Sequence, residues 1–547
     1  MKYIKWLWHK SGNVRPDVVW NVVLACVGIG LNMFFIWQSK TLVDMATGGF
    51  PSRPIMLSAA VLVATMLMRV LVNAVRTRVE SNSVYKMQFI IRKELFSGLI
   101  REQYGGKDRF HSGDAVNRMF TDVDVVAKVI CQDVPALCAT TVQLAAAFIF
   151  LCTMDVRLAL TLLLITPAFA VFGKIFFRRM RRLTKDIRDS ESHVQSHIQE
   201  TLQHKVVVQS LEQCGGMENV LDHLQDNEYA QVSGRTKFNV FSRAVVSAAF
   251  GLGYSAALLW GVFGIWEGAV TFGVMTAFLQ LVGQIQGPSM QLTRQIPSLI
   301  YAAASMERLM EIEFSEKEES GNPVCLRGPA GIRISHLTFR YADGNDSVFN
   351  DFSYDFKPRS RTAVVGETGV GKTTLIKLML SLLKPSSGRV EVYSGDRSEV
   401  ASALTRNNLT YVPQGNTLFS GTVRDNLRMG DSEADDSRML EALDVAAAGF
   451  VRELPHGLDT VVGETGAGLS EGQAQRIAIA RGLLRPGSIM LLDEFSSSLD
   501  PETERQLLRN LTSYSVDKTI IFITHREAVL EYCDNVLNLQ VSASRSL

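Results

Sequence analysis

The stretch Gly366-Glu-Thr-Gly-Val-Gly371-Lys372-Thr373-Thr374 decides the fold of the C-terminal part of the chain. The apolar residues 362–365 before it predict a buried strand, and a helical pattern follows from Leu375. A strand, a glycine-rich loop and a helix in this order form a P-loop. In such a loop, glycines let backbone N–H groups converge on a phosphate at a helix N-terminus. The stretch therefore predicts an α/β domain that binds a nucleotide.

Two side chains of the P-loop have predicted roles of their own. Lys372 neutralises the β- and γ-phosphates, and the Thr373 hydroxyl can ligate Mg²⁺. Chance matches to the glycine pattern occur, but the flanking strand and helix favour a true P-loop here.

Two further strands bring the groups that nucleotide hydrolysis needs. Residues 489–492 form an apolar run that ends in Asp493 and Glu494, and residues 519–524 form another that ends in His525. A carboxylate such as Asp493 at the tip of a buried strand can organise Mg²⁺ through water, and Glu494 can polarise the attacking water. Taken alone, strand-end acids are often helix caps, and a lone histidine is often structural. Beside a P-loop, the catalytic interpretation is favoured.

A second helix N-terminus is predicted in the stretch Gly468-Leu469-Ser470-Glu471-Gly472-Gln473-Ala-Gln-Arg476. Ser470 followed three residues later by Gln473 is a capping box, in which each residue satisfies a backbone N–H of the other. Gly472 allows a close approach, so this helix terminus can bind a second phosphate surface.

The two ends of the chain differ in composition. The 547 residues are 47% hydrophobic and 20% charged, and this average combines an N-terminal half rich in long apolar runs with a soluble C-terminal third. A net charge of +1 offers nucleic acid no bulk electrostatic attraction. None of the seven cysteines forms a CxxC pair, so the sequence predicts small core residues rather than a disulfide framework or a zinc site.

Hydropathy predicts an all-α transmembrane domain of about six helices. Each run holds close to the ~20 apolar residues that cross the hydrocarbon layer, and the first, second and last also contain polar residues. The segment before the first run, with Trp6 and Trp8, is interpreted as a retained interfacial helix and not a signal peptide. The predicted spans are 17–38, 54–75, 134–154, 158–177, 244–266 and 271–291.

Loop charges predict the orientation. The segments 76–130 and 178–182 are rich in Lys and Arg, whereas the connections 154–158 and 266–271 have one such residue or none. By the positive-inside rule, both basic segments and both termini are cytoplasmic. Residues 84–99 and 190–211 are polar and contain few Pro or Gly, which favours membrane helices that continue beyond the lipid over an ordinary soluble loop domain.

Polar residues inside the spans have two interpretations each. Arg69 either contacts a substrate or, as we favour, lies near the cytoplasmic end of its span and snorkels. The four glutamines of the last span fall on one helix face. They either line a wet translocation cavity or form hydrogen bonds between helices, and the pattern does not decide between these. They are Gln280, Gln284, Gln291 and Gln295.

The domain boundaries follow from a charged stretch that contains Gly and Pro. Residues 313–330 are predicted to be a linker. We therefore expect a transmembrane domain over 1–312 and a nucleotide-binding domain over 331–547.

These motifs together resemble the ABC transporter family, in its exporter-type half-transporter form. From Ile332 onward the order of motifs matches the family's nucleotide-binding domain, and the Leu469–Gln473 stretch resembles its signature motif, which is far more specific than a P-loop alone. Gly113-Asp114, Asp122 and Glu200 through Lys205 are similar to recurring positions of exporter membrane domains, so the resemblance covers nearly the whole chain.

The resemblance implies a role for each matching residue. Tyr341 stands where the family stacks an aromatic ring on adenine, Gln414 matches the Q-loop, Leu499-Asp500 the D-loop and His525 the switch histidine. The implied ATP-binding residues are Tyr341, Gly366, Thr368, Gly369, Gly371, Lys372, Thr373, Thr374, Gln414, Ser470, Gly472 and Gln473. The implied Mg²⁺ ligands are Thr373, Gln414 and Asp493, and the implied catalytic residues are Glu494, His525 and Lys372.

Two positions depart from the family pattern. Glu471 stands where the family usually has glycine, and a carboxylate beside a phosphate site could slow hydrolysis unless it points outward. Thr465 stands where an arginine is common in exporters, which puts one contact between the cytoplasmic and membrane domains in doubt.

The resemblance also implies a dimer. It places ATP between the P-loop of one subunit and the signature helix of the other, and this chain has one of each, so a second half-transporter is expected. A homodimer is favoured over a heterodimer because Lys372, Glu494 and His525 are all present. ATP binding would favour the closed state and so shift the population in an alternating-access cycle.

The leading hypothesis is ATP-driven export across a bacterial cytoplasmic membrane. An ATP-gated channel or regulator would not need both Glu494 and His525, and the apolar spans exclude a soluble ABC ATPase. An importer built on the exporter fold stays open, because no motif encodes direction. Drugs, lipids and lipid-linked molecules fit the weakly polar spans about equally, and peptides are not excluded. No nucleic-acid partner is expected.

Overall fold

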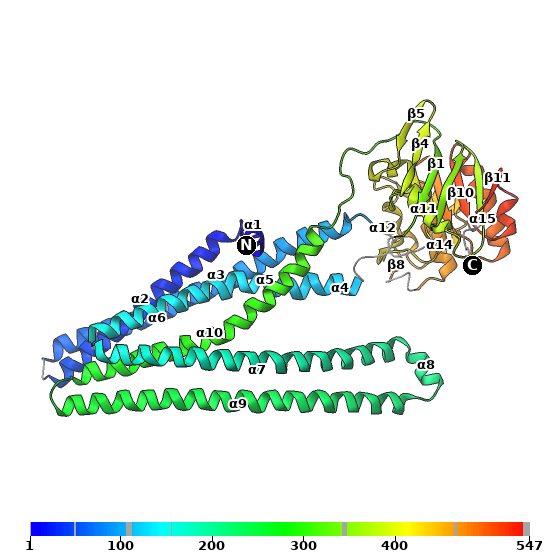
Figure 1. The fold of residues 1–547 in the computed structure, drawn as a ribbon. Helices are drawn as coiled ribbons and strands as arrows, with labels where there is room; N and C mark the ends of the chain where they lie inside the picture. The colour runs from blue at the N-terminus through cyan, green and yellow to red at the C-terminus, as the bar shows by residue number, and fades with distance from the viewer. Residues whose placement is uncertain are drawn as a thin grey trace. The chain divides into compact units, whose positions relative to one another are not determined.

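The computed structural model describes residues 2–48, 51–104, 112–154, 156–341, 347–463 and 468–539, with the side chains of some helical stretches, the longest being 156–175, left out. The contacts divide the chain into two compact units. The first contains residues 1–96 and 114–313, and the second contains residues 97–113 and 314–547. The ribbon drawing labels the helices and strands of each unit (Figure 1).

The described part of the first unit consists of helices joined by short turns. Two π-helical turns, η1 and η2, interrupt the third long helix on either side of α5. The helices are α1 (Lys2–Lys10), α2 (Arg15–Thr47), α3 (Ser52–Ile100, whose last turn lies in the second unit), α4 (Ser112–Asn117), η1 (Arg118–Asp122), α5 (Val123–Lys128), η2 (Val129–Asp133), α6 (Val134–Met154), α7 (Val156–Gln203), α8 (Lys205–Ser210), α9 (Cys214–Trp266) and α10 (Phe272–Glu313).

Each predicted span lies in one of these helices, except that the span 271–291 begins one residue before α10. Among the residues whose side chains are described, four helices are long and apolar enough to cross a membrane: Arg15–Thr47, Ser52–Ile100, Gly113–Thr153 and Cys214–Trp266. The helix α10 begins with a shorter apolar stretch, Phe272–Ile285. The predicted span 158–177 lies in α7, where nearly all side chains fall outside the described ones.

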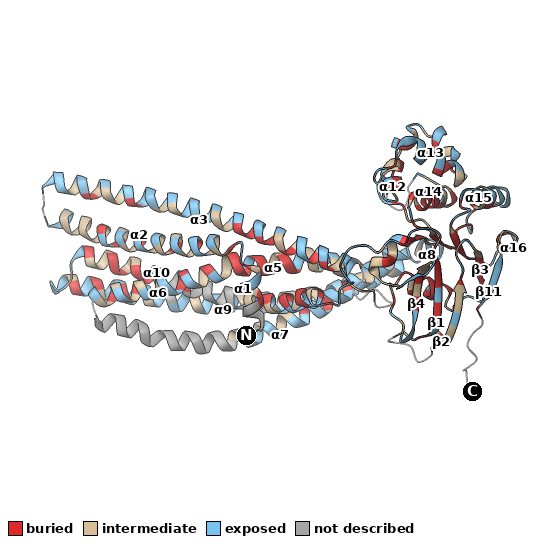
Figure 2. Ribbon diagram, turned by 90° about the horizontal axis from the view of Figure 1, so that it is seen from above, coloured by how far each residue is buried: buried red, intermediate tan, exposed pale blue. Residues whose placement is uncertain are grey.

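The long helices bury a narrow apolar seam and expose other apolar residues. Ile36, Leu151, Phe278 and Leu281 are fully buried where α2, α6 and α10 pack together. Large apolar side chains elsewhere on these helices are exposed, for example Leu67 on α3 at 65%, and the exposed faces are visible along α2 and α3 (Figure 2). Helices that bury so little apolar surface against one another suit a lipid environment.

The predicted cytoplasmic extensions are helical, with one break. Residues 84–99 continue α3, as expected. Residues 190–211 do not form a single helix, because the chain leaves α7 at His204 (φ −105°, ψ 24°) and makes the short helix α8 before it turns back into α9. The helices α7 and α9 then run side by side (Figure 1).

Two carboxylates, the buried Asp122 and the half-buried Asp133, join the third long helix to α10. Asp122, at the end of η1, is 3% exposed. It accepts hydrogen bonds at 2.8 Å from both Ser305 Oγ and Arg308 Nε. Asp133, at the end of η2, accepts one at 2.6 Å from Ser298 Oγ. A buried charge needs such partners, and Asp122 is one of the positions that resembled exporter membrane domains.

Two of the four glutamines of the last span form hydrogen bonds between helices. Gln280 Nε2 donates to Ser39 Oγ at 3.2 Å, and Gln143 Nε2 donates to Gln284 Oε1 at 2.7 Å. These contacts agree with the interhelical interpretation for this pair. The side chains of Gln291 and Gln295 lie outside the described ones. The guanidinium of Arg69 lies 5.5 Å from the centre of the Phe35 ring, a cation–π contact between α3 and α2.

The second unit is an α/β domain with two main sheets. The strands are β1 (Gly331–Phe339), β2 (Phe349–Phe356), β3 (Arg361–Val365), β4 (Ser387–Ser394), β5 (Arg397–Val400), β6 (Leu409–Val412), β7 (Gly421–Thr422), β8 (Val461–Val462), β9 (Ile489–Asp493), β10 (Thr519–Ile523) and β11 (Asn535–Asn538). The helices are α11 (Lys372–Met379), η3 (Ala403–Asn408), α12 (Val423–Arg428), α13 (Asp436–Val445), η4 (Gly449–Glu453), η5 (Gly457–Asp459), α14 (Glu471–Leu484), α15 (Pro501–Tyr514) and α16 (Glu527–Leu530).

The parallel sheet positions the site. Its order is β11-β3-β10-β9-β6, and all four pairings are parallel. Every residue of β9 and of β10 is buried, as is typical of a sheet covered on both faces. An antiparallel sheet with the order β2-β1-β4-β5 lies against the same apolar core. The carboxyl ends of β3, β10, β9 and β6 therefore meet at one edge, where ligands bind in such sheets.

The segment after α3 contacts the P-loop helix. Glu102 forms a β-bridge with Lys317, and Gln103 Nε2 donates to the carbonyl of Leu382 at 2.9 Å. The Lys377 ammonium on α11 donates to the Tyr104 hydroxyl at 3.1 Å. These contacts place the beginning of the 97–113 segment in the second unit.

Candidate functional site

The site is assembled at the carboxyl edge of the parallel sheet. The strand β3 leads into Gly366, β9 ends in Asp493 followed by Glu494, and Thr524 separates the end of β10 from His525. The strand β6 leads to Gln414 two residues after it ends. Residues that are more than 150 positions apart in the sequence are thus brought to neighbouring strand ends.

The P-loop has the backbone that only glycine adopts without strain. Gly366, Gly369 and Gly371 have φ values of 154°, 85° and 107°. A Cβ at Gly366 would lie 2.6 Å from the carbonyl oxygen of Leu539, and one at Gly371 would lie 2.5 Å from Val348 Cγ1. The glycines at these positions are therefore required by the local packing as well as by the phosphate that the loop is predicted to hold. Thr368 is exposed at the outside of this loop.

The Lys372 side chain folds back over the loop. Its ammonium donates to the carbonyl oxygen of Gly366 at 2.6 Å and to that of Glu367 at 3.3 Å, and the residue is only 7% exposed. The positive charge is thereby held next to the backbone that is expected to surround the phosphates, at the N-terminus of α11.

Glu494 is held from two sides. Its Oε2 accepts a hydrogen bond from Gln414 Nε2 at 2.6 Å, and its Oε1 lies 2.7 Å from His525 Nε2. Its φ of 44° is unusual for a residue other than glycine, and strained backbone of this kind clusters at functional sites. The structure thus brings together three predicted site residues that come from three different strand ends.

Asp493 is a buried carboxyl whose ionised form is disfavoured, because the positive charge near it does not offset the cost of burial. It is 3% exposed, and its Oδ2 accepts from the Tyr411 hydroxyl at 3.4 Å. Burial, and next the charge of Glu494, raise the pKa of this carboxyl, although hydrogen bonds from Tyr411 and Thr373 and the charge of Lys372 oppose the rise. Two adjacent carboxylates and a threonine hydroxyl are oxygen ligands, which suit Mg²⁺.

We expect Asp493→Asn to raise the unfolding temperature of the nucleotide-free domain at pH 7 by about 2–4 °C, the effect of about 1 kcal/mol. The folded-state pKa of Asp493 is raised. Its ionised form therefore destabilises the fold at pH values above that pKa, and the penalty disappears as the pH falls towards the ordinary value near 4. The gain from the asparagine should shrink over the same range. Thermal unfolding monitored by fluorescence from pH 7 to pH 4 tests this.

The matched control is Asp517→Asn. Asp517 is exposed and pairs with Arg359 at the surface, so this change should move the unfolding temperature by less than a degree or so. An unfolding temperature that falls in Asp493→Asn at pH 7 would contradict the electrostatic account of this carboxyl.

Tyr341 lies beside the first turn of the P-loop helix. Its hydroxyl is 2.9 Å from Thr374 Oγ1, and its ring meets that of Phe339 edge to face with centroids 5.0 Å apart. The ring is therefore close to the loop that the resemblance assigns to the phosphates, as a residue that stacks on adenine must be.

The predicted capping box is present at the start of α14. The Gln473 N–H donates to Ser470 Oγ at 3.2 Å, and the Ser470 N–H donates to Gln473 Oε1 at 2.9 Å. A Cβ at Gly472 would lie 2.8 Å from the carbonyl oxygen of Ser498, so glycine is needed for this approach. Glu471 is the first residue of the helix and is exposed. In the described part of the chain these side chains hydrogen-bond within their own turn and not with the P-loop.

Thr465 lies outside the described residues, so the structure does not place the contact that its substitution puts in doubt.

Two functional candidates were not predicted from the sequence. Tyr411 donates to Asp493, and Arg526 follows His525 directly. Their positions beside Gln414 and His525 were the only signal, since neither residue type stands out in the sequence.

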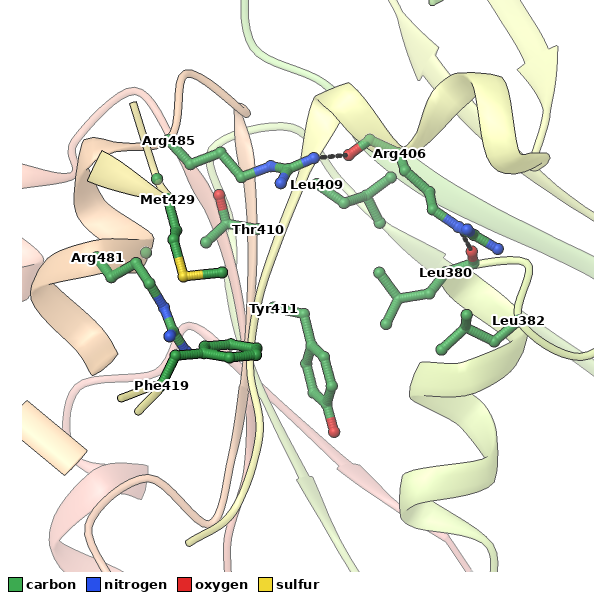
Figure 3. Close-up of a pocket in the computed structure, with 12 residues that line it drawn as sticks. Leu380, Leu382, Arg406, Leu409, Thr410, Tyr411, Phe419, Met429, Arg481 and Arg485 are labelled. Carbon is green, nitrogen blue, oxygen red and sulfur yellow. Dashed lines mark hydrogen bonds between the residues drawn. The ribbon is translucent and has the colours of Figure 1, made fainter. Parts of the chain in front are cut away.

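A cavity of about 280 Å³ lies beside β6 (Figure 3). Its arginines are engaged: Arg481 donates to Thr417, Arg485 to the Arg406 carbonyl, and Arg406 to the Leu380 carbonyl. Tyr411 belongs both to the cavity wall and, through its hydroxyl, to the surroundings of Asp493. Burial raises the pKa of Tyr411, so the hydroxyl stays a neutral donor. The wall contains Leu380, Leu382, Arg406, Leu409, Thr410, Tyr411, Phe419, Met429, Gly430, Arg481, Gly482 and Arg485, none of them a predicted nucleotide residue.

Two family models match the chain. The model of the ABC transporter transmembrane region matches residues 18–289, and the ABC transporter model matches residues 349–497. The second match includes the P-loop, Gln414, the Ser470–Gln473 capping box and Glu494, while His525 lies beyond it. The two matches together cover most of the chain in the order that the sequence analysis predicts.

Curated relatives extend over most of the chain. A putative multidrug export ATP-binding/permease protein of Bacillus subtilis, YgaD, is 25% identical over 470 residues, which are 83% of this chain and 79% of that protein. A protein of the same description from Staphylococcus aureus (strain NCTC 8325 / PS 47) is 28% identical over 464 residues, with the same coverage. A solved structure of a bacterial Atm1-family ABC exporter with ATP bound is 21% identical, has a TM-score of 0.82 and covers 96% of this chain and 94% of its own, which establishes a shared fold.

These matches confirm the fold class, a transmembrane helical domain followed by an ABC-type α/β domain. They also confirm that the chain spans the membrane several times, binds ATP and hydrolyses it to drive transport. One transmembrane region and one ATP-binding domain make half of a transporter, so a dimer is implied. The chain belongs to the ABC transporter family.

Proposed function

We propose that two copies of this chain form an exporter in a bacterial cytoplasmic membrane, with the nucleotide-binding domains in the cytoplasm. The observation that carries the proposal is Glu494 held between Gln414 and His525 at the carboxyl edge of the sheet. An arrangement that orients one carboxylate from two sides suits a general base for water. A chain that carries this arrangement needs no catalytic residue from a different partner, which favours the homodimer over a heterodimer.

The proposed domain boundaries are 1–312 for the transmembrane domain, 313–330 for the linker and 331–547 for the nucleotide-binding domain. The helix α10 ends at Glu313 and β1 begins at Gly331, which supports these positions.

In the proposed site, the P-loop surrounds the phosphates of ATP. The backbone of Gly366, Thr368, Gly369 and Gly371 and the N-terminus of α11, with Thr374, supply the N–H groups. Lys372, whose charge already lies against the loop, neutralises the β- and γ-phosphates. The ring of Tyr341 stacks on the adenine beside Thr374.

The proposed Mg²⁺ ligands are Thr373, Gln414 and Asp493. The raised pKa of Asp493 supports this assignment, because a cation would relieve the repulsion between Asp493 and Glu494. A bound Mg²⁺ would neutralise charge that develops on the phosphates. Glu494 then takes a proton from the attacking water, and His525 keeps the Glu494 carboxylate oriented through the contact at Oε1.

The Ser470, Gly472 and Gln473 terminus of α14 is proposed to hold the ATP of the second copy. Its described hydrogen bonds stay within its own turn, so its outer face remains available for a phosphate. Each chain then offers two half-sites, and two chains complete two sites. ATP stabilises the closed dimer and hydrolysis releases it, which is a population shift between two states of the membrane domain.

Export, and not import, is supported by the curated relatives that are named as multidrug export proteins. A drug, a lipid or another amphipathic small molecule is the proposed class of substrate. The cytoplasmic position of the nucleotide-binding domain rests on the basic segments 76–130 and 178–182.

The test is the ATPase activity of the purified chain alone in lipid nanodiscs, with Glu494→Gln as the background control. Activity well above that control, in particles that contain two chains, is the expected result. Activity equal to the control that appears only when another half-transporter is added would overturn the homodimer. Direction is tested in proteoliposomes with MgATP outside: an exporter moves a lipophilic fluorescent dye into the lumen, and loss of dye from the lumen would indicate import.

A further inference from the structure

Arg526 joins the loop of the switch histidine to the loop that follows Glu494. Its Nη2 donates to the carbonyl oxygen of Ser497 at 2.8 Å, and its Nη1 donates to that of Leu499 at 3.2 Å. Nη1 also lies 3.0 Å from Glu504 Oε2, in the first turn of α15. One guanidinium thus binds three acceptors in the segment from Ser497 to the first turn of α15.

Further contacts connect the loops of Ser497 and His525 to Glu494. The Ser497 N–H donates to the carbonyl oxygen of Glu494 at 3.2 Å, and the Glu494 N–H donates to the carbonyl oxygen of Ile523 at 2.9 Å. His525 returns to Glu494 at 2.7 Å and is followed at once by Arg526. Adjacent Cα atoms are held about 3.8 Å apart, so fixing the Arg526 side chain on Ser497 also limits where the His525 backbone can lie relative to Glu494.

The chemistry of these contacts requires arginine. A guanidinium presents a planar fork of five N–H donors, whereas a lysine ammonium is a point charge on a flexible stem. The Glu504 side chain is 4% exposed, and among the described residues its Oε1 has no hydrogen-bond partner. Arg526 is therefore also the cation that makes the burial of Glu504 tolerable.

We propose that Arg526 is a positioning residue for ATP hydrolysis, which keeps His525 and the 497–499 loop in fixed positions relative to Glu494. The inference rests on the proposed function, in which Glu494 and His525 carry the reaction. Arg526 has no described contact with the P-loop or with Tyr341. Its loss should therefore slow hydrolysis and leave the binding of ATP nearly unchanged.

The first test is Arg526→Lys in the full chain in nanodiscs. Lysine keeps a positive charge for Glu504 but cannot reach the two carbonyl oxygens as well. We expect kcat to fall about 10-fold, since a misplacement of about 1 Å at an active site can cost up to about 10²-fold. The KM for ATP and the affinity for ATP should change by less than about twofold, and the unfolding temperature by at most a few degrees.

A second pair of variants separates positioning from stability. Arg526→Gln leaves the buried Glu504 carboxylate without its cation and should lower the unfolding temperature by about 5 °C or more. Adding Glu504→Gln to it removes the stranded charge and should restore most of that temperature, while kcat stays low. The matched control is Arg509→Lys, on an exposed position of α15, which should leave kcat, KM and unfolding temperature unchanged.

Three outcomes would overturn the inference. They are an unchanged kcat in Arg526→Lys, a kcat that recovers together with stability in the double variant, and an ATP affinity that falls as much as kcat does. The proposed function fails by a different result, namely a Glu494→Gln variant that still hydrolyses ATP. A Glu494→Gln variant without activity beside a fully active Arg526→Lys variant would reject the role of Arg526 alone.

Discussion

Glu494→Gln should hydrolyse ATP about 10²–10⁴ times more slowly than the unmodified chain while it binds ATP with nearly the same affinity. Glutamine has the shape of glutamate but cannot accept the proton of the attacking water. Its side chain can still lie between Gln414 and His525, so the surrounding structure should persist. Phosphate release in nanodiscs gives the rate, and equilibrium binding of a fluorescent ATP analogue gives the affinity.

The matched control for this substitution is Glu441→Gln, an exposed position of α13. It should retain full activity. A Glu494→Gln variant that keeps more than about a tenth of the rate would show that another group activates the water. The residue to examine next would be Asp493, the other carboxylate at the end of β9.

Lys372→Met should weaken the binding of ATP by about 10- to 150-fold, which corresponds to the loss of a charged hydrogen bond worth about 1.5–3 kcal/mol. In the structure the ammonium rests on the carbonyl oxygens of Gly366 and Glu367, within the loop that is to hold the phosphates. Methionine keeps the length and the apolar stem of the side chain and removes only the charge and the donors. Titration calorimetry of the nucleotide-binding step measures the change.

Lys384→Met provides the comparison for Lys372→Met. Lys384 is exposed and pairs with Glu316 at 2.6 Å, away from the P-loop, so its loss should not alter the affinity for ATP. Equal affinities in Lys372→Met and the unmodified chain would mean that backbone N–H groups and Mg²⁺ supply all of the phosphate binding.

Much of this protein is determined by patterns that are local in the sequence. The apolar runs 489–492 and 519–524 became β9 and β10 because residues buried on both faces of a parallel sheet must be apolar throughout. The capping box of Ser470 and Gln473 depends on two residues three positions apart and formed as predicted. The apolar spans likewise follow from composition over about 20 residues, since only a helix satisfies its own backbone groups in lipid.

Tertiary structure decided the contacts between residues that are distant in the sequence. Arg526 lies next to His525 in the chain, but nothing in its sequence neighbourhood indicates that its partners are Ser497, Leu499 and Glu504. Asp122 meets Arg308 from another helix, and a break at His204 interrupts the stretch 190–211 that the sequence predicts to be helical. Such outcomes depend on how strands and helices are ordered in space, and hydrogen-bond geometry between them is set only when the whole domain packs.

The sequence alone therefore determined the two kinds of domain and the P-loop, and it predicted the residues that we propose to surround ATP, because each of these follows from a local periodicity or a fixed spacing. Only the tertiary structure decided that Gln414 and His525 both contact Glu494, and that Arg526 donates a hydrogen bond to the loop that follows Glu494. The physical reason is that parallel strands far apart in the chain end at the same edge of the sheet, so that residues about 30 to 80 positions apart become neighbours.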